Sequence, residues 1–106
     1  MPLSKAEVDD VVARYLERVR QHIPVEAAYV YGSYARDRAT DDSDVDVAVI
    51  STAFGGYRHD DLVLLSRLRL PDAVLIEARP FTSAEYHELP WGSFLREVLQ
   101  TGRKVV

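Results

Sequence analysis

The chain has 106 residues, with 13 lysines and arginines, 17 aspartates and glutamates, and a formal net charge of −4. This length predicts a single domain over residues 1–106 with a core of its own. The acidic balance argues against direct binding of duplex nucleic acid, and the absence of cysteine excludes disulfides, thiolate metal sites and a cysteine nucleophile. No apolar run is long enough for a membrane helix, and the acidic start is unlike a secretion signal, so we expect a cytoplasmic protein.

The first predicted element is an amphipathic helix. Apolar residues recur at three- and four-residue spacing over residues 4–21, and charged residues occupy the opposite face. Ser4 and Glu7 have the spacing of a capping box at the helix start, and Pro24 follows its end. The helix is therefore expected to bury one face against the rest of the chain.

A strand, a tight turn and a helical turn are predicted next. Residues 25–31 are β-branched and aromatic and predict the strand, Gly32-Ser33 predicts the turn, and residues 34–38 predict the helical turn. The polar stretch 37–43 cannot bury itself and is expected to be a loop.

Residues 44–50 have the clearest strand pattern in the sequence. Their alternation places three valines on one face and both aspartates, Asp44 and Asp46, on the other. Both faces become apolar after Asp46, so we expect an internal strand covered on both sides, with the carboxylates at its open end.

The second half of the chain continues the alternation of helices and strands. The predictions, in chain order, are a helix through residues 60–68 capped by Asp60 or Asp61, a strand over 73–79, a capping box at Thr82 and Glu85, a closing helix over 93–100 stopped by Gly102, and an edge strand at 104–106. The strand over 73–79 would place Glu77 and Arg79 on one face. No repeat or linker interrupts the pattern, which predicts a single α/β unit.

The segment 32–46 combines three devices that bind phosphate and metal. A Gly32-Ser33 turn before a helix start exposes backbone N–H groups, and Arg36, within one turn, offers a planar fork of donors for phosphate oxygens. Asp44 and Asp46 project from one strand face with Cα atoms about 6.6 to 6.8 Å apart, so that they can converge on one cation. Mg²⁺ suits such a pair because it takes hard oxygen ligands and is completed by substrate phosphates.

Each device also has a structural explanation. Short acidic repeats commonly cap loops, and Arg36 or Arg38 would neutralise the aspartates as well as a metal would. Asp41 and Asp42 are interpreted as solvated loop charges. The combination, in the order strand, Gly-Ser turn, helical turn, loop and acidic strand, favours the phosphate and metal interpretation.

Gly32-Ser33, then ten residues, then Asp44, one residue and Asp46 resembles the signature of the minimal nucleotidyltransferases (MNT), small members of the DNA polymerase β-like superfamily. The resemblance is dense over residues 31–50 and extends loosely through 76–81 to the closing helix. It implies an α/β (α+β) fold with a small mixed sheet flanked by helices. It also implies Mg²⁺-dependent transfer of a nucleoside monophosphate from a nucleoside triphosphate, ATP by family resemblance, with release of pyrophosphate.

The resemblance also assigns roles to residues. Gly32, Ser33 and Arg36 would bind the nucleotide, and Asp44 and Asp46 would hold two Mg²⁺ ions. Glu77 is our choice for the third family carboxylate, as metal ligand or as base for the acceptor hydroxyl, with Asp72 in reserve. An ion pair between Glu77 and Arg79 is the competing explanation for Glu77.

One residue departs from the family pattern. Where many relatives read Gly-Ser-x-Ala-Arg-Gly, this chain has Asp37 in place of the last glycine. Its charge would weaken triphosphate binding, unless Asp37 simply pairs with Arg38.

The resemblance further implies a partner protein. Small MNT proteins are commonly encoded beside HEPN-domain ribonuclease toxins and act as antitoxins by adenylylating a toxin tyrosine. We therefore expect a HEPN partner, a hetero-oligomer and an acceptor hydroxyl on another chain; Tyr86, Leu89 and Trp91 would form either a docking surface or part of the core. Two alternatives stay open: an inactive binding module of the same fold that masks a partner, which Asp37 favours, and a transferase for a small-molecule hydroxyl.

Overall fold

A computed structural model describes residues 2–55, 58–69 and 75–106. The elements in chain order are α1 (Lys5–Arg20), β1 (Ala27–Tyr31), the 3₁₀ turn η1 (Gly32–Tyr34), β2 (Val45–Ser51), α2 (Arg58–Leu68), β3 (Ile76–Thr82), α3 (Ser83–Glu88), α4 (Phe94–Thr101) and β4 (Arg103–Lys104). None of the helices in these ranges combines the length and the apolar character that crossing a bilayer requires.

The strands form one mixed sheet in the order β3-β2-β1-β4. β1 pairs antiparallel with both β2 and β4, whereas β2 pairs parallel with β3. A parallel pair needs a crossover connection, and α2 lies on the connection between β2 and β3. The expected mixed sheet flanked by helices is confirmed.

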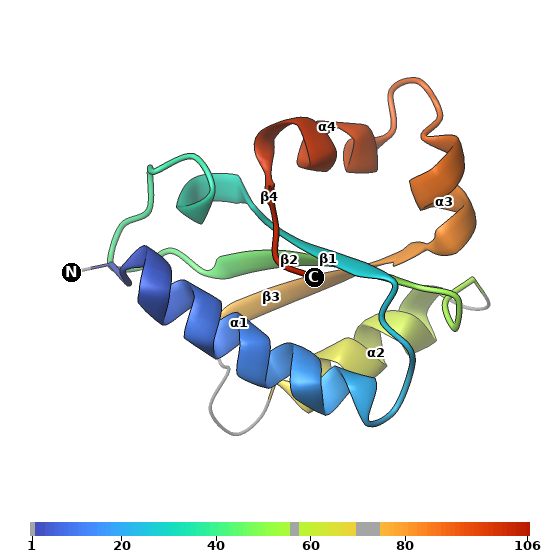
Figure 1. The fold of residues 1–106 in the computed structure, drawn as a ribbon, viewed down its shortest axis with the longest axis horizontal. Coiled ribbons are helices and arrows are strands. Elements are labelled where there is room, and N and C mark those ends of the chain that lie inside the picture. Colours follow the sequence, from blue (N-terminus) through green and yellow to red (C-terminus); the bar gives the residue numbers. More distant parts are fainter. Residues whose placement is uncertain (1, 56–57, 70–74) are drawn as a thin grey trace.

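Helices cover both faces of the sheet (Figure 1). α1 and α2 lie on the face that carries the valines of β2, and α3 and α4 lie on the other face. β2 has neighbours on both edges, and its residues from Val47 to Ser51 are buried. The prediction that this strand is internal, with its acidic end least covered, is therefore confirmed.

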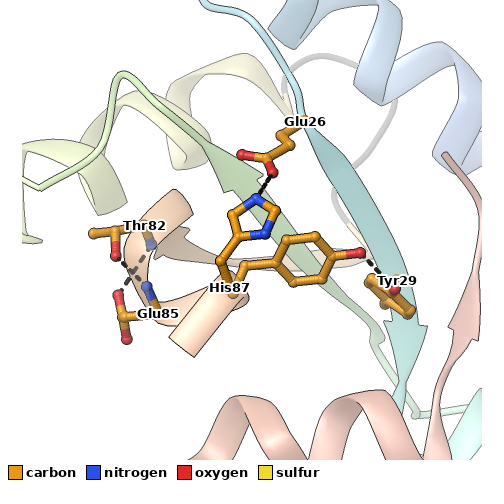
Figure 2. A network of polar contacts seen from close by, with 6 residues as sticks. Glu26, Tyr29, Thr82, Glu85 and His87 are labelled. Carbon is orange, nitrogen blue, oxygen red and sulfur yellow. Dashed lines mark hydrogen bonds and ion pairs between the residues drawn. The ribbon is translucent and has the colours of Figure 1, made fainter. Parts of the chain in front are cut away.

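Two predicted capping boxes are present. At α1, the Glu7 N–H donates to Ser4 Oγ over 3.1 Å and the Ser4 N–H donates to Glu7 Oε1 over 2.9 Å. At α3, Thr82 and Glu85 exchange the same two hydrogen bonds, each 3.0 Å long (Figure 2). These bonds satisfy N–H groups that the first turn of a helix leaves unpaired.

Several predicted boundaries differ from the structure. β3 covers residues 76–82 rather than 73–79, because its parallel register with β2 runs from Val45 opposite Ile76 to Ser51 opposite Thr82; residues 73 and 74 lie outside the described ranges. Asp60 and Asp61 lie in the first turn of α2 rather than at its cap, since the helix begins at Arg58.

The predicted docking residues of the α3–α4 region separate into two groups. Tyr86 and Leu89 are partly buried and pack against the cluster under α3 and α4. Trp91, the single tryptophan, is 90% exposed, and the guanidinium of Arg96 lies 4.6 Å from its ring centroid. The core interpretation therefore holds for the first two residues and not for Trp91.

Candidate active site

The parallel register of β2 and β3 brings together carboxylates that are far apart in the sequence. Asp46 lies directly opposite Glu77, and on the other side of β2 it lies opposite Tyr31 of β1. Paired residues of neighbouring strands point to the same face, so all three side chains share the face that α3 and α4 cover elsewhere. Asp44 is exposed and immediately precedes β2. The predicted trio thus lies at one end of the sheet, and Asp72 lies outside the described residues.

The charges of these carboxylates act on one another. The pKa of Asp46 is raised from 3.8 to about 6, first by burial and then by the negative charges of Glu77 and Asp44, against a smaller opposing effect of Arg79. Like charges that cannot both be solvated favour protonation of one member or binding of a cation. Asp46 is therefore the carboxylate whose charge the fold supports least in the absence of a cation.

Gly32 combines a left-handed backbone conformation with a close approach to the Asp46 carboxylate. Its φ of +72° is a conformation that L side chains rarely adopt, and a Cβ built there would overlap Asp46 Oδ2 and lie 3.2 Å from Cγ. The sequence interpretation assigned Gly32 to phosphate binding alone. This second role depends on the pairing of Tyr31 with Asp46, which no local pattern at residue 32 reveals.

The turn after β1 is shorter than expected and starts earlier. The helical conformation begins at Gly32 rather than residue 34 and is a single 3₁₀ turn: the N–H groups of Ala35 and Arg36 donate to the Gly32 carbonyl oxygen over 3.2 and 3.1 Å. The first N–H groups of such a turn have no partner within it, and Ser33 is among the residues that supply them. So short a turn has little helix dipole, so phosphate binding here would depend on these donors individually.

The arginines expected to neutralise the acidic end have other partners. Arg36 lies 3.7 Å from Glu97 of α4, and the guanidinium of Arg79 lies 4.8 Å from the ring centroid of Phe94. Within the described ranges no arginine forms an ion pair with Asp44, Asp46 or Glu77. The competing structural explanations of the acidic cluster, including a Glu77–Arg79 pair, therefore lack support.

Asp37 adopts a conformation that suits glycine. Its φ is +58°, in the left-handed region, and it is exposed. Aspartate is one of the few other residues that visit this region readily. The geometry explains why a glycine fits this position, and the described residues show no ion pair between Asp37 and Arg38.

The three carboxylates are of the ligand type that Mg²⁺ prefers, but they do not form a closed coordination site. Asp44, Asp46 and Glu77 provide hard oxygen ligands at one end of the sheet, and the raised pKa of Asp46 shows the charge that a cation would compensate. No group of three or more potential ligands among the described residues is already arranged as a metal site. Mg²⁺ usually retains waters and binds one or two carboxylates plus substrate phosphates, so an open set of this kind is compatible with it.

A small hollow adjoins the turn. It measures about 170 Å³, lies between η1 and α4, and is lined in part by Gly32, Arg36, Phe94 and Glu97. The sequence interpretation did not identify this hollow, since it depends on how α4 packs over the end of β1. The space beside Gly32 and Arg36 is thus open.

Comparisons with known proteins bear on the family and the fold of the chain. The sequence model of a family described as nucleotidyltransferase domain matches residues 12–91, a span that contains both Gly32 and Glu77. The fold is similar to the crystal structure of a candidate nucleotidyltransferase from Sulfolobus solfataricus, with a TM-score of 0.64 and 20% identity, covering 78% of this chain and 74% of that chain. No curated protein gives a significant match.

Proposed function

Since the chain belongs to the nucleotidyltransferase domain family, we propose that it transfers AMP from ATP to a hydroxyl group of a partner protein, and that it is the antitoxin of a HEPN-domain toxin. The observation that carries the transferase part is the contact between the Gly32 turn and Asp46, with Glu77 opposite Asp46 in the sheet. This contact places a turn suited to phosphate against carboxylates suited to a divalent cation.

In the proposed in-line displacement at the α-phosphorus, each of these residues has a separate role. N–H groups of the Gly32-Ser33 turn and the guanidinium of Arg36 would hold the phosphates. Asp44, Asp46 and Glu77 would hold Mg²⁺, which would supply positive charge for the attacking and leaving oxygens. The acceptor hydroxyl oxygen attacks the α-phosphorus, and the bond to pyrophosphate breaks. Glu77 is placed to accept the proton of that hydroxyl when it is not a metal ligand. No protein nucleophile is needed.

The partner assignment depends on the resemblance to the minimal nucleotidyltransferases. Trp91 supports it, because a tryptophan that is 90% exposed is uncommon on a surface without a partner. A tyrosine of a HEPN toxin is the acceptor we propose.

A second candidate is an inactive module of the same fold that masks a partner. The specific observation in its favour is that the described carboxylates are not already arranged as a metal site. The absence of arginine ion pairs to Asp44, Asp46 and Glu77 within the described ranges weighs against it, because an inactive module has no reason to keep such charges uncompensated.

The test is Mg²⁺-dependent transfer of labelled AMP from ATP to a co-purified partner or to the product of the neighbouring gene. Asp44→Asn and Asp46→Asn should each abolish transfer while the chain stays folded, and Asp42→Asn, in the exposed loop, should retain it. Mg·ATP should also raise the melting temperature of the wild-type chain. Absence of both transfer and stabilisation would support the module; transfer to aminoglycosides or nucleotides by the chain alone would support a small-molecule acceptor.

A further inference from the structure

We propose that Arg79 binds the phosphate tail of the nucleotide. This inference rests on the proposed transferase function and adds a residue that neither the motif nor the family match assigns. The inference depends on two observations. Arg79 lies over the Phe94 ring and forms no ion pair with a carboxylate among the described residues, and it is on the same sheet face as Asp46 and Glu77.

Register places Arg79 beside the carboxylates. It lies two residues after Glu77 in β3 and opposite Ala48 in β2, so its side chain leaves the same face as Glu77 and Asp46. Residues at this spacing on a strand have Cα atoms about 6.6 to 6.8 Å apart. A phosphate group close to Glu77 would therefore be within reach of a side chain as long as arginine.

An aromatic cluster holds the guanidinium in place. Its central carbon lies 4.8 Å from the ring centroid of Phe94, and that ring contacts Tyr31 edge-on at 5.6 Å and stacks with Phe81 at 6.4 Å between centroids. Arg79 is partly buried. The described residues show no hydrogen bond or ion pair of the Arg79 guanidinium, so its N–H donors stay available while the cation–π contact with Phe94 positions it.

The positive charge of Arg79 influences neighbouring groups of the site, although Arg79 forms no ion pair among the described residues. Arg79 lowers the pKa of Tyr31 against a larger raising effect of burial, and it lowers the pKa of Asp46 against larger raising effects of burial, Glu77 and Asp44. Three carboxylates occupy this end of the sheet, and a divalent cation would compensate them. A guanidinium without an ion pair would then be left facing the anionic oxygens of the phosphate tail, for which its fork of donors is suited.

Three other arginines of the described ranges lie over aromatic rings, Arg18, Arg58 and Arg96, and the last two provide comparisons. Arg58, at the start of α2, lies 5.9 Å from the ring centroid of Phe81, and Arg96 of α4 lies over Trp91 and donates to the Leu89 carbonyl oxygen. The ring under Arg58 is at the far end of the same strand face, because Phe81 pairs with Ile50 of β2 whereas Glu77 pairs with Asp46, and Arg96 lies on α4. Arg58 is thus the matched control, since it has the same chemistry without the location.

The experiment compares binding of Mg·ATP and Mg·AMP to the full chain by titration calorimetry. Arg79→Met keeps the length and the packing on Phe94 but removes the charge, and it should weaken Mg·ATP binding by about tenfold or more while leaving Mg·AMP binding within about twofold. Arg79→Lys should fall between this variant and the wild-type chain, because it keeps the charge and loses the fork. Arg58→Met should bind both nucleotides as the wild-type chain does.

The outcomes separate the two proposals. If the wild-type chain binds Mg·ATP and Arg79→Met binds it equally well, or loses Mg·ATP and Mg·AMP in parallel, the role of Arg79 is overturned and the proposed function stands. If Arg79→Met does not fold, Arg79→Lys decides: unchanged Mg·ATP binding overturns the inference. If the wild-type chain binds no Mg·nucleotide, the proposed function is overturned, and the inference with it.

Discussion

Gly32 and Asp46 meet because two demands of the backbone coincide. The chain must leave β1 with a positive φ, and the residue that does so lies against the carboxylate of the neighbouring strand. Glycine is the one residue that satisfies both conditions without strain or overlap. The missing Cβ of Gly32 thus leaves space for the Asp46 carboxylate. In the proposed function, it would also let the backbone of the turn approach a phosphate closely.

The loss of unfolding free energy caused by a side chain overlapping Asp46 can be measured by comparing alanine substitutions of two glycines. Gly32→Ala should destabilise the chain more than Gly92→Ala, because Gly92 has a similar φ of +77° but no atom within 4 Å of an added Cβ. We expect Gly92→Ala to cost about 1 kcal/mol for the backbone conformation, and Gly32→Ala about 1 to 3 kcal/mol more for the overlap. Urea unfolding at equilibrium measures both values.

A double-mutant comparison then identifies the source of the difference. In an Asp46→Ala background the overlapping carboxylate is gone, so Gly32→Ala and Gly92→Ala should cost nearly the same. An equal cost of the two substitutions in the wild-type background would show that Asp46 is not what Gly32 accommodates.

Asp46 also makes stability depend on pH. Folding raises its pKa from 3.8 to about 6, so the folded chain holds this proton more tightly than the unfolded chain does. The favourable effect is therefore present at acid pH and is lost as the pH rises towards 6. Without divalent ions, Asp46→Asn should stabilise the chain by about 1 to 2 kcal/mol at about pH 8, a value reduced for partial solvent exposure, and by little at about pH 4.

Denaturant unfolding in a chelator at the two pH values measures this effect. Asp42→Asn, in the exposed loop, is the control and should change stability little at either pH. Added Mg²⁺ should narrow the gap between wild type and Asp46→Asn at about pH 8. A wild-type chain at least as stable as Asp46→Asn under chelation would contradict the burial of an uncompensated charge.

Among the elements, α3 is short and is held by polar contacts from several directions. Its start carries the Thr82 and Glu85 capping box, His87 contacts the Glu26 carboxylate ahead of β1, and the hydroxyls of Tyr86 and Tyr29 share a 3.0 Å hydrogen bond (Figure 2). The Ser83 hydroxyl and then His87 lower the pKa of Glu26. A six-residue helix has little stability of its own, so these contacts position it on the sheet.

Thr82→Ala should therefore destabilise the chain by about 1 kcal/mol, because it removes the acceptor for the Glu85 N–H and leaves the Glu85 side chain without its reciprocal arrangement. Urea unfolding measures the loss, and amide hydrogen exchange should show it concentrated in α3. Thr82→Ser keeps the hydroxyl and should retain most of the stability. Equal losses in the two variants would assign the effect to the methyl group of Thr82 rather than to the cap.

The sequence predicted those elements whose signals are local. The Ser4 and Thr82 capping boxes and the two faces of β2 are each encoded by a few neighbouring side chains, and they are confirmed. The edge strand predicted over residues 104–106 is instead Arg103–Lys104, which pairs with β1. Phe94, in the first turn of α4, is 42% exposed and lies against Tyr31, Phe81 and Arg79.

What the sequence could not predict depends on contacts between distant segments. The start of β3 follows from its register with β2, the pairing of Arg36 with Glu97 follows from the packing of α4, and the second role of Gly32 follows from the position of Asp46. The family match covers these segments without specifying side-chain partners. The roles of Asp44, Asp46 and Glu77 in metal binding stay predictions.

At the scale of the whole molecule, the two sides of the sheet are covered unequally. α1 and α2 pack over the face that carries Val45, Val47 and Val49, and the hydroxyl of buried Tyr15 joins them by donating to the Leu65 carbonyl oxygen. α3 and α4 lie over the opposite face (Figure 1), on which Asp46 is partly buried and Glu77 is exposed. One side thus supplies most of the core, while the other leaves room for a ligand.

The register of the parallel pair β2 and β3 determines whether Asp46 and Glu77 lie side by side, so an error in this register would produce a misfolded chain without the carboxylate pair. A slip of one residue between these strands would turn Glu77 towards α1 and α2 and bury Ile76 beside Asp46 instead. Such a chain would have lost the binding site while keeping nearly all of its helices and strands. If the chain binds Mg·ATP as we propose, the ligand would associate with the correctly aligned chains alone and draw a refolding mixture towards them, so that ligand binding would select for accurate assembly.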